Sequence, residues 1–151
     1  MPKEIVIVED NTEDSLRVIQ CVQEAFPDGD FRGTAITSES AFCTTLPRMQ
    51  ADPPALVFMN IVLRWDDPRA PRQKPPEMEG HGPHLAGFRC LARLATHLVT
   101  KDIPVILYTD LDPSEFRLDH LPPNARFLPV REEAGMPDFD NRVVKAVREF
   151  L

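Results

Sequence analysis

Short, uninterrupted apolar runs that alternate with segments of helical periodicity constrain the fold of this chain most strongly. Residues 5–8 (IVIV), 55–59 (ALVFM) and 103–108 (IPVILY) have the composition of strands that are buried on both faces of a sheet. Weaker runs at 34–37 (TAIT) and 126–128 (RFL) bring the number of predicted strands to five. Strands of this kind are typical of parallel sheets that are covered by helices on both faces.

The segments between these strands carry apolar residues at three- and four-residue steps, which predicts amphipathic helices. The first helix is expected to have Asn11 or Thr12 as its N-cap and to end at the sequence Pro27-Asp28-Gly29. Its predicted buried face consists of Leu16, Ile19, Val22, Ala25 and Phe26.

Four further helices are predicted along the chain. The second begins at Ser38, and Pro47 is expected to kink it or to end it early. The third is predicted from the apolar residues at positions 85, 88, 91, 94, 95 and 98. A short fourth helix is expected after Asp112, because a proline and then a glutamate follow this capping residue at favourable positions. The last helix begins at Asp138 or Asp140.

This alternation predicts one three-layer α/β domain over residues 1–151, with a doubly wound parallel sheet. The exception is the segment 64–83, where five prolines lie among charged residues and apolar content is almost absent. We interpret this segment as an inserted loop. Trp65, the only tryptophan, lies at its start, and two roles are open for its ring: sealing the neighbouring site or anchoring a partner.

Composition excludes several classes of function. The net charge is -7 and opposite charges are interspersed, which argues against a nucleic-acid-binding face. We also expect neither a signal peptide nor a membrane span. The three cysteines lack metal-ligand spacing and favour a reducing, cytoplasmic location. His81, His84 and Cys90 lie near one another in the sequence but match no established metal-binding pattern.

Polar residues follow three of the predicted strands directly. Glu9 and Asp10 follow the first strand, Asn60 follows the third, and Thr109 follows the fourth. Open α/β sheets bind ligands outside the carboxyl ends of their strands, where the strand order reverses. We therefore expect the functional site at these four residues.

The strand-end motifs resemble those of receiver domains of bacterial two-component response regulators. The motifs are 8–11 (VEDN), 58–63 (FMNIVL), 108–110 (YTD) and 127–131 (FLPVR), and they occur in the family's order. The resemblance runs from about Lys3 to the C-terminus. It implies a CheY-like, flavodoxin-like fold with strand order 2-1-3-4-5 and five helices. By the same resemblance, Thr109 and Phe127 match the switch positions that relay phosphorylation to the output face.

Within this resemblance, Asn60 occupies the position of the aspartate that accepts phosphate. A carboxylate oxygen attacks phosphorus to form an acyl phosphate, whereas a neutral amide oxygen is a poor nucleophile. Val130 lies nearest to the position of the family's lysine, and replacement of that lysine by Arg131 would require a shifted loop. Asp110 replaces a small residue and is expected to repel an incoming anion. The resemblance therefore implies a pseudo-receiver without the family's phosphorylation chemistry, and no enzyme activity.

Glu9 and Asp10 match the acidic pair that holds Mg²⁺ in the family. An equally simple interpretation is that both are solvated acids ahead of a helix. Because Asn60 removes the third carboxylate, we expect either no cofactor or weakly bound Mg²⁺ at Glu9, Asp10 and Asn60.

The leading functional hypothesis is a signalling module that binds a protein partner, such as a histidine kinase or another regulator, independently of phosphorylation. The expected docking or homodimer face spans residues 112–151. A second hypothesis is a phosphorylatable switch, in which Asn60 is an engineered change or Asp66 or Asp67 accepts the phosphoryl group. A third is a small-molecule-binding module of flavodoxin-like architecture, which is disfavoured because no glycine-rich loop follows the first strand.

Overall fold

The computed structural model describes residues 2–66, 82–130 and 138–151. Five parallel strands form one sheet in the order β2-β1-β3-β4-β5, which confirms the predicted order. The strands are β1 (Lys3–Val8), β2 (Phe31–Ile36), β3 (Leu56–Asn60), β4 (Val105–Thr109) and β5 (Ala125–Pro129).

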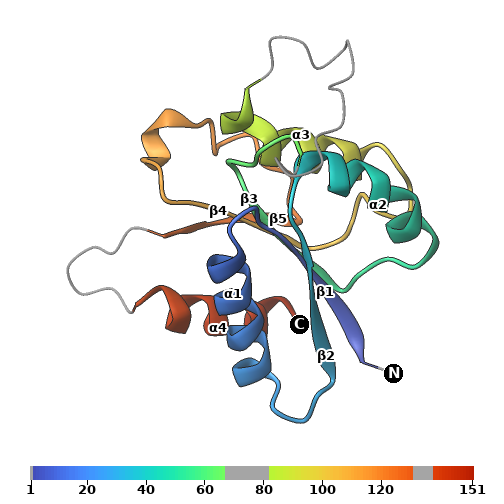
Figure 1. Cartoon of the computed structure of the whole chain (residues 1–151), viewed down its shortest axis with the longest axis vertical. Coiled ribbons are helices and arrows are strands. Elements are labelled where there is room, and N and C mark those ends of the chain that lie inside the picture. The colour runs from blue at the N-terminus through green and yellow to red at the C-terminus, as the bar shows by residue number, and fades with distance from the viewer. Residues whose placement is uncertain (1, 67–81, 131–137) are drawn as a thin grey trace.

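Helices cover both faces of this sheet, so the predicted three layers are present (Figure 1). Helices α1 (Thr12–Ala25) and α4 (Phe139–Phe150) lie side by side on one face. Helices α2 (Glu39–Ala51) and α3 (Ala86–Ala95) lie on the other. No helix among the described residues is long and apolar enough to span a bilayer.

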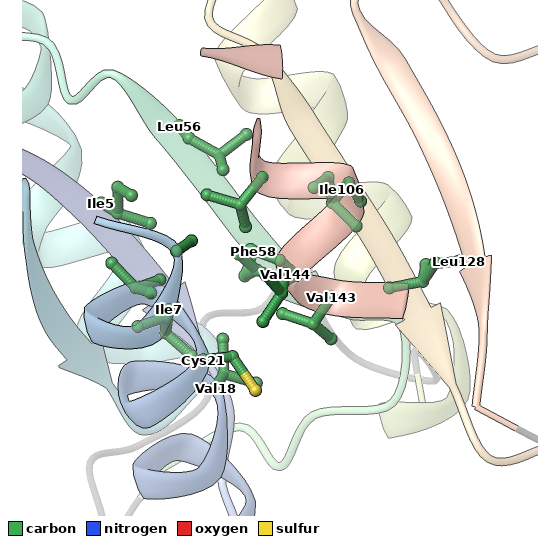
Figure 2. Packing of buried hydrophobic residues seen from close by; sticks show 14 of the residues in the cluster. Ile5, Ile7, Val18, Cys21, Leu56, Phe58, Ile106, Leu128, Val143 and Val144 are labelled. Atoms are coloured by element: carbon green, nitrogen blue, oxygen red, sulfur yellow. The ribbon is translucent and has the colours of Figure 1, made fainter. Parts of the chain in front are cut away.

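The alternation of side chains along each strand divides the core into two clusters. In β1, Ile5 and Ile7 pack in the cluster beneath α1 and α4, while Val6 and Val8 pack in the cluster beneath α2 and α3. Figure 2 shows the first cluster, in which Val143 of α4 packs over the sheet. This alternation also determines which face each residue at a strand end approaches.

Helix α1 begins directly after Asn11, one of the two predicted caps. Asn11 is the N-cap, and its Oδ1 accepts a hydrogen bond from the Asp14 amide at 3.0 Å. Ser15 and Val18 lie on the buried side of the helix, whereas Leu16 is 52% exposed. The prediction that Leu16 belongs to the buried face is therefore wrong by one position. Helix α2 continues through Pro47 to Ala51, so the proline does not end it early.

Five helices were expected, but the described residues contain four α-helices. The segment predicted as the fourth helix forms only the 3₁₀ turn Pro113–Glu115, in which the Asp112 side chain accepts from the Ser114 amide at 3.0 Å. Phe116 is already extended. Two consecutive prolines at 122 and 123 disfavour helical backbone in the residues before them, which leaves little chain for a longer helix.

Candidate functional site

Three polar side chains meet at the carboxyl ends of β1, β3 and β4. Ile5 and Ile7 of β1 point to the sheet face that α1 and α4 cover. Glu9 lies two residues after Ile7, so its side chain points to the same face. Asn60 is the last residue of β3 and points to the same face as Leu56 and Phe58. It is paired in register with Tyr108 of β4. Neighbouring parallel strands thus bring Glu9, Asn60 and Tyr108 together at one level.

Glu9 is 1% exposed, and neutral donors satisfy its carboxylate. The Asn60 Nδ2 group donates to both carboxylate oxygens, at 3.0 and 3.1 Å. The Tyr108 hydroxyl donates to Oε1 at 3.0 Å, and the Asn11 amide donates to Oε2 at 3.1 Å. No lysine or arginine is among these partners.

A separate hydrogen bond fixes the orientation of the Asn60 amide. The Val62 amide donates to Asn60 Oδ1 at 3.0 Å. Because a backbone N–H needs an acceptor, the oxygen must face Val62 and the NH₂ group must face Glu9. An ionised aspartate at position 60 would have no such donor and would place a second negative charge beside Glu9.

Burial raises the pKa of Glu9 from its ordinary value of 4.5 to about 7. Hydrogen bonds from Asn11, Asn60 and Tyr108 oppose this effect, while the hydrogen bond with Asp10 adds to it. Burial, followed by the charge of Glu9, also raises the pKa of Tyr108. The site therefore contains a carboxyl group that changes its protonation state near neutral pH.

A pocket of about 270 Å³ opens above these residues. Besides Glu9, its lining includes the carboxylates of Asp10, Asp14 and Asp110. Arg17 also lines it, but the guanidinium pairs with Asp140 at 2.5 Å. Carboxylates therefore outnumber cations among the described residues that line the pocket.

The oxygens that receivers would offer to a metal are engaged by donors here. Asp10 Oδ2 accepts from the Arg64 amide at 3.0 Å, and Asn60 Oδ1 accepts from Val62. Both oxygens of Glu9 are also engaged. Within the described ranges, no cluster of three acidic, histidine or cysteine side chains has the geometry of a metal site. The arrangement therefore does not fit the Mg²⁺ that the fold family implies.

Two of the four remaining predicted positions line the pocket, and two lie away from it. Asp110 is exposed and Val130 is half-buried, and both line the pocket. Thr109 is buried, outside the pocket lining, and its hydroxyl accepts from the Leu111 amide at 3.2 Å. The ring of Phe127 packs in the core beneath α2 and α3. The structure thus brings Glu9, Asp10, Asn60, Asp110 and Val130 together and leaves Thr109 and Phe127 apart from them.

Of the two alternative acceptors, Asp66 and Asp67, the structure describes only Asp66. Asp66 does not line this pocket, and its Oδ1 accepts a hydrogen bond from the Ser40 hydroxyl at 2.8 Å. Asp67, His81 and Arg131 lie outside the described residues, as does most of the predicted 64–83 loop.

Sequence reasoning missed two residues of this region. Tyr108 is predicted as the last strand residue and quoted in the motif 108–110 without a role, although a hydroxyl in a buried strand requires a hydrogen-bond partner and so indicates a polar neighbour. Arg142 of α4 is 8% exposed and donates to the carbonyls of Pro129 and Val130 at the end of β5. A basic residue within an otherwise apolar helix face was the available signal for Arg142.

Several solved structures are similar to this chain. The chemotaxis response regulator CheY4 of Vibrio cholerae is 12% identical with a TM-score of 0.64, and the match covers 100% of both chains. The receiver domain of the sensor histidine kinase PA1611 from Pseudomonas aeruginosa PAO1, with a magnesium ion in its active-site cleft, is 12% identical with a TM-score of 0.63. That match covers 99% of this chain and 98% of the other.

NtrX from Brucella abortus is 15% identical with a TM-score of 0.63; the match covers 99% of this chain and 27% of NtrX. This chain therefore spans about a quarter of NtrX. No sequence model of a protein family matches the chain, and neither does any curated protein. The structural similarity shows that the chain has the receiver fold of two-component response regulators.

Proposed function

We propose that this chain is a pseudo-receiver, a signalling module that binds a protein partner without being phosphorylated at the strand-end site. One observation carries the proposal: the Asn60 amide stands at the acceptor position and donates to both oxygens of Glu9. At position 60 an amide that donates hydrogen bonds replaces the carboxylate that would attack phosphorus. Glu9, which would help to hold a metal, accepts hydrogen bonds from this amide.

The charge around the pocket supports the same proposal. Asp110 adds a carboxylate at the pocket, and Val130 supplies no cation there. Arg142 holds the end of β5 through backbone carbonyls and is not among the residues that line the pocket. An incoming phosphoryl group would thus meet carboxylates without the compensating lysine that receivers use.

The partner surface is proposed on β5 and α4, within the predicted face 112–151. The helix predicted after Asp112 is only a 3₁₀ turn, so the strand and α-helix that the described residues contribute to this face are β5 and α4. The exposed side of α4 presents the cations Lys145 and Arg148 beside Glu149. Such a surface suits an acidic patch on a histidine kinase or another regulator, or on a second copy of the chain.

Affinity capture under non-phosphorylating conditions tests this function. The wild type and Asn60→Ala should retain the same partner, because neither depends on a phosphoryl group. The double change Lys145→Glu and Arg148→Glu should reduce capture by at least about tenfold, since like charges would then face the partner. Arg32→Glu, an exposed reversal on β2, is the matched control. Capture that requires a phosphodonor, or that survives the double reversal, would contradict the proposal.

A further inference from the structure

The sheet ends at β2 on one side and at β5 on the other, and the two edge strands differ in what they offer to a further strand. On β5, Pro129 carries no N–H, and its carbonyl accepts a hydrogen bond from Arg142. The Ala125 amide donates to the Pro122 carbonyl. The β2 strand contains no proline, so its edge is the better template for a further strand.

The backbone groups of β2 divide between the sheet and its outer edge. The carbonyls of Asp30 and Ile36 accept hydrogen bonds from amides of the β1 segment, each at 2.9 Å. Backbone direction alternates along a strand, so the even-numbered residues face β1. The N–H and C=O groups of Phe31, Gly33 and Ala35 therefore point outward, away from the sheet.

Helix α1 runs antiparallel to β2 and places apolar side chains beside this edge (Figure 1). The rings of Phe26 and Phe31 lie 4.3 Å apart between centroids. Ile19 packs so closely on Gly33 that a Cβ there would lie 2.9 Å from Ile19 Cγ1. The later part of α1 thus pairs with the beginning of β2.

One apolar residue of this helix face is left in solvent. Leu16 lies one turn before Ile19 and therefore near the level of Ala35, two residues after Gly33. It is 52% exposed, and Ala35 is exposed as well. At the other end of the same edge is a hollow of about 520 Å³, whose lining includes Ile19, Gln23, Phe26, Phe31 and Gly33.

We propose that two copies of this chain form a two-fold symmetric dimer in which their β2 strands pair antiparallel, with Gly33 opposite Gly33 of the second copy. In this register Phe31 lies opposite Ala35 of the second copy, so a large side chain meets a small one. All the outward-facing residues are then paired through their backbone groups, whereas any other antiparallel register leaves at least one of them unpaired.

The apolar side chains of the two copies are complementary in the same register. Because Leu16 lies near the level of Ala35, it comes beside Phe31 of the second copy and next to the hollow there. Two-fold symmetry repeats this contact at the other end of the strand pair. Each exposed leucine is thus removed from water by the other copy, which favours association.

The charges on the opposite face of β2 also fit a second copy. Arg32 is exposed, and in this register it lies opposite Thr34 of the second copy. The Thr34 hydroxyl donates to Glu4 Oε2 at 3.0 Å, so the guanidinium extends across Thr34 toward a carboxylate. The second copy therefore carries the counter-charge for Arg32, which an unrelated strand need not carry.

Sedimentation velocity over a concentration series tests whether the dimer forms, and we expect the dimer fraction to rise with concentration. Amide hydrogen exchange followed by NMR tests the register. The amides of Phe31, Gly33 and Ala35 should become protected as concentration rises, whereas those of Arg32 and Thr34 should be protected throughout because they face β1.

Leu16→Glu should weaken the dimer by at least about tenfold, because it places a charge against the partner's apolar surface. Leu98→Glu, at a position that is 81% exposed, is the matched control and should leave the dimer unchanged. Ala35→Pro removes an outward N–H that the monomer's sheet does not use, and should also weaken the dimer by at least about tenfold.

Three results would overturn this proposal. They are a monomer at every concentration, a dimer whose formation leaves the exchange of Phe31, Gly33 and Ala35 unchanged, and equal dimerisation of the wild type and a folded Leu16→Glu variant. The proposal is independent of the partner face on β5 and α4, because β2 and β5 form opposite edges of the sheet.

Discussion

Two buried glutamates at the starts of successive helices on opposite faces of the sheet have different partners and different pKa values. Glu9 precedes α1 and Glu39 opens α2, and each is 1% exposed. Neutral donors from Asn11, Asn60 and Tyr108 surround Glu9, whereas Arg89 and Arg93 hold Glu39. The two carboxylates are equally buried but differ in the charge of their partners.

Their pKa values move in opposite directions as a result. Burial raises the pKa of Glu9 to about 7, and its neutral hydrogen bonds only partly offset that rise. Burial would also raise the pKa of Glu39, but the hydrogen bonds and charges of Arg89 and Arg93 overcome this effect and lower it. Glu39 thus stays ionised at neutral pH and links α2 to α3 through its ion pairs. Glu9 instead changes its protonation state near neutral pH.

The largest effect is expected from Glu39→Gln. The change leaves the partly exposed guanidinium groups of Arg89 and Arg93 without their buried counter-charge, and it should lower the free energy of unfolding by about 2–4 kcal/mol. Urea unfolding at neutral pH measures this loss. Glu149→Gln, in a half-exposed ion pair with Arg126, is the control and should change stability by less than about 1 kcal/mol. Equal losses in the two variants would remove the distinction between buried and surface ion pairs.

The comparison is sharpened by Glu9→Gln, which removes the group with the raised pKa. Between its unfolded value of 4.5 and its folded value of about 7, the folded protein binds more protons than the unfolded chain. The wild type should therefore lose stability relative to the variant as the pH rises through this window, by about 1–3 kcal/mol in total. Unfolding of both proteins across the window measures the difference, and a constant difference would contradict the raised pKa.

Asn60→Asp is expected to give the next largest effect. A second carboxylate within hydrogen-bond distance of Glu9 should lower stability by about 1–2 kcal/mol near neutral pH without metal. Mg²⁺ should restore part of this loss in the variant and have little effect on the wild type, as thermal unfolding with and without the ion would show. Asn141→Asp, an exposed change in the first turn of α4, should show neither effect.

Tyr108→Phe should give the smallest effect, because it removes one of the donors to Glu9. The expected loss is about 0.5–1.5 kcal/mol above the Glu9 pKa and less below it, since the ionised carboxylate depends most on its donors. The pH dependence of the loss is the diagnostic measurement. A loss that does not vary with pH would assign Tyr108 a packing role alone.

The sequence predicted the framework because strand burial and strand order follow from short apolar runs in alternation. It also predicted that Glu9, Asp10 and Asn60 would meet, since the ends of parallel strands converge. It did not predict the hydrogen bonds between them. The orientation of the Asn60 amide depends on the Val62 backbone. The bond from Tyr108 to Glu9 was missed because Tyr108 ends an apolar strand and was counted as a core residue.

The errors have local physical causes. Leu16 was misplaced because the face of α1 that packs on the sheet is centred on Val18 and Val22, and neighbouring residues in a helix point about 100° apart. The missing fourth helix had a well-formed start at Asp112, but local capping cannot sustain a helix that prolines soon interrupt. The ionic cluster of Glu39 joins residues far apart in the sequence, and no local pattern indicated it.

The central claim, that Asn60 blocks phosphorylation, is tested most directly by intact mass spectrometry. The wild type and Asn60→Asp would be incubated in parallel with Mg²⁺ and a small-molecule phosphodonor. The account predicts that the wild type gains no phosphoryl mass; a gain by Asn60→Asp alone would show that the asparagine is the sole block. A phosphoryl adduct on the unaltered protein would contradict the claim.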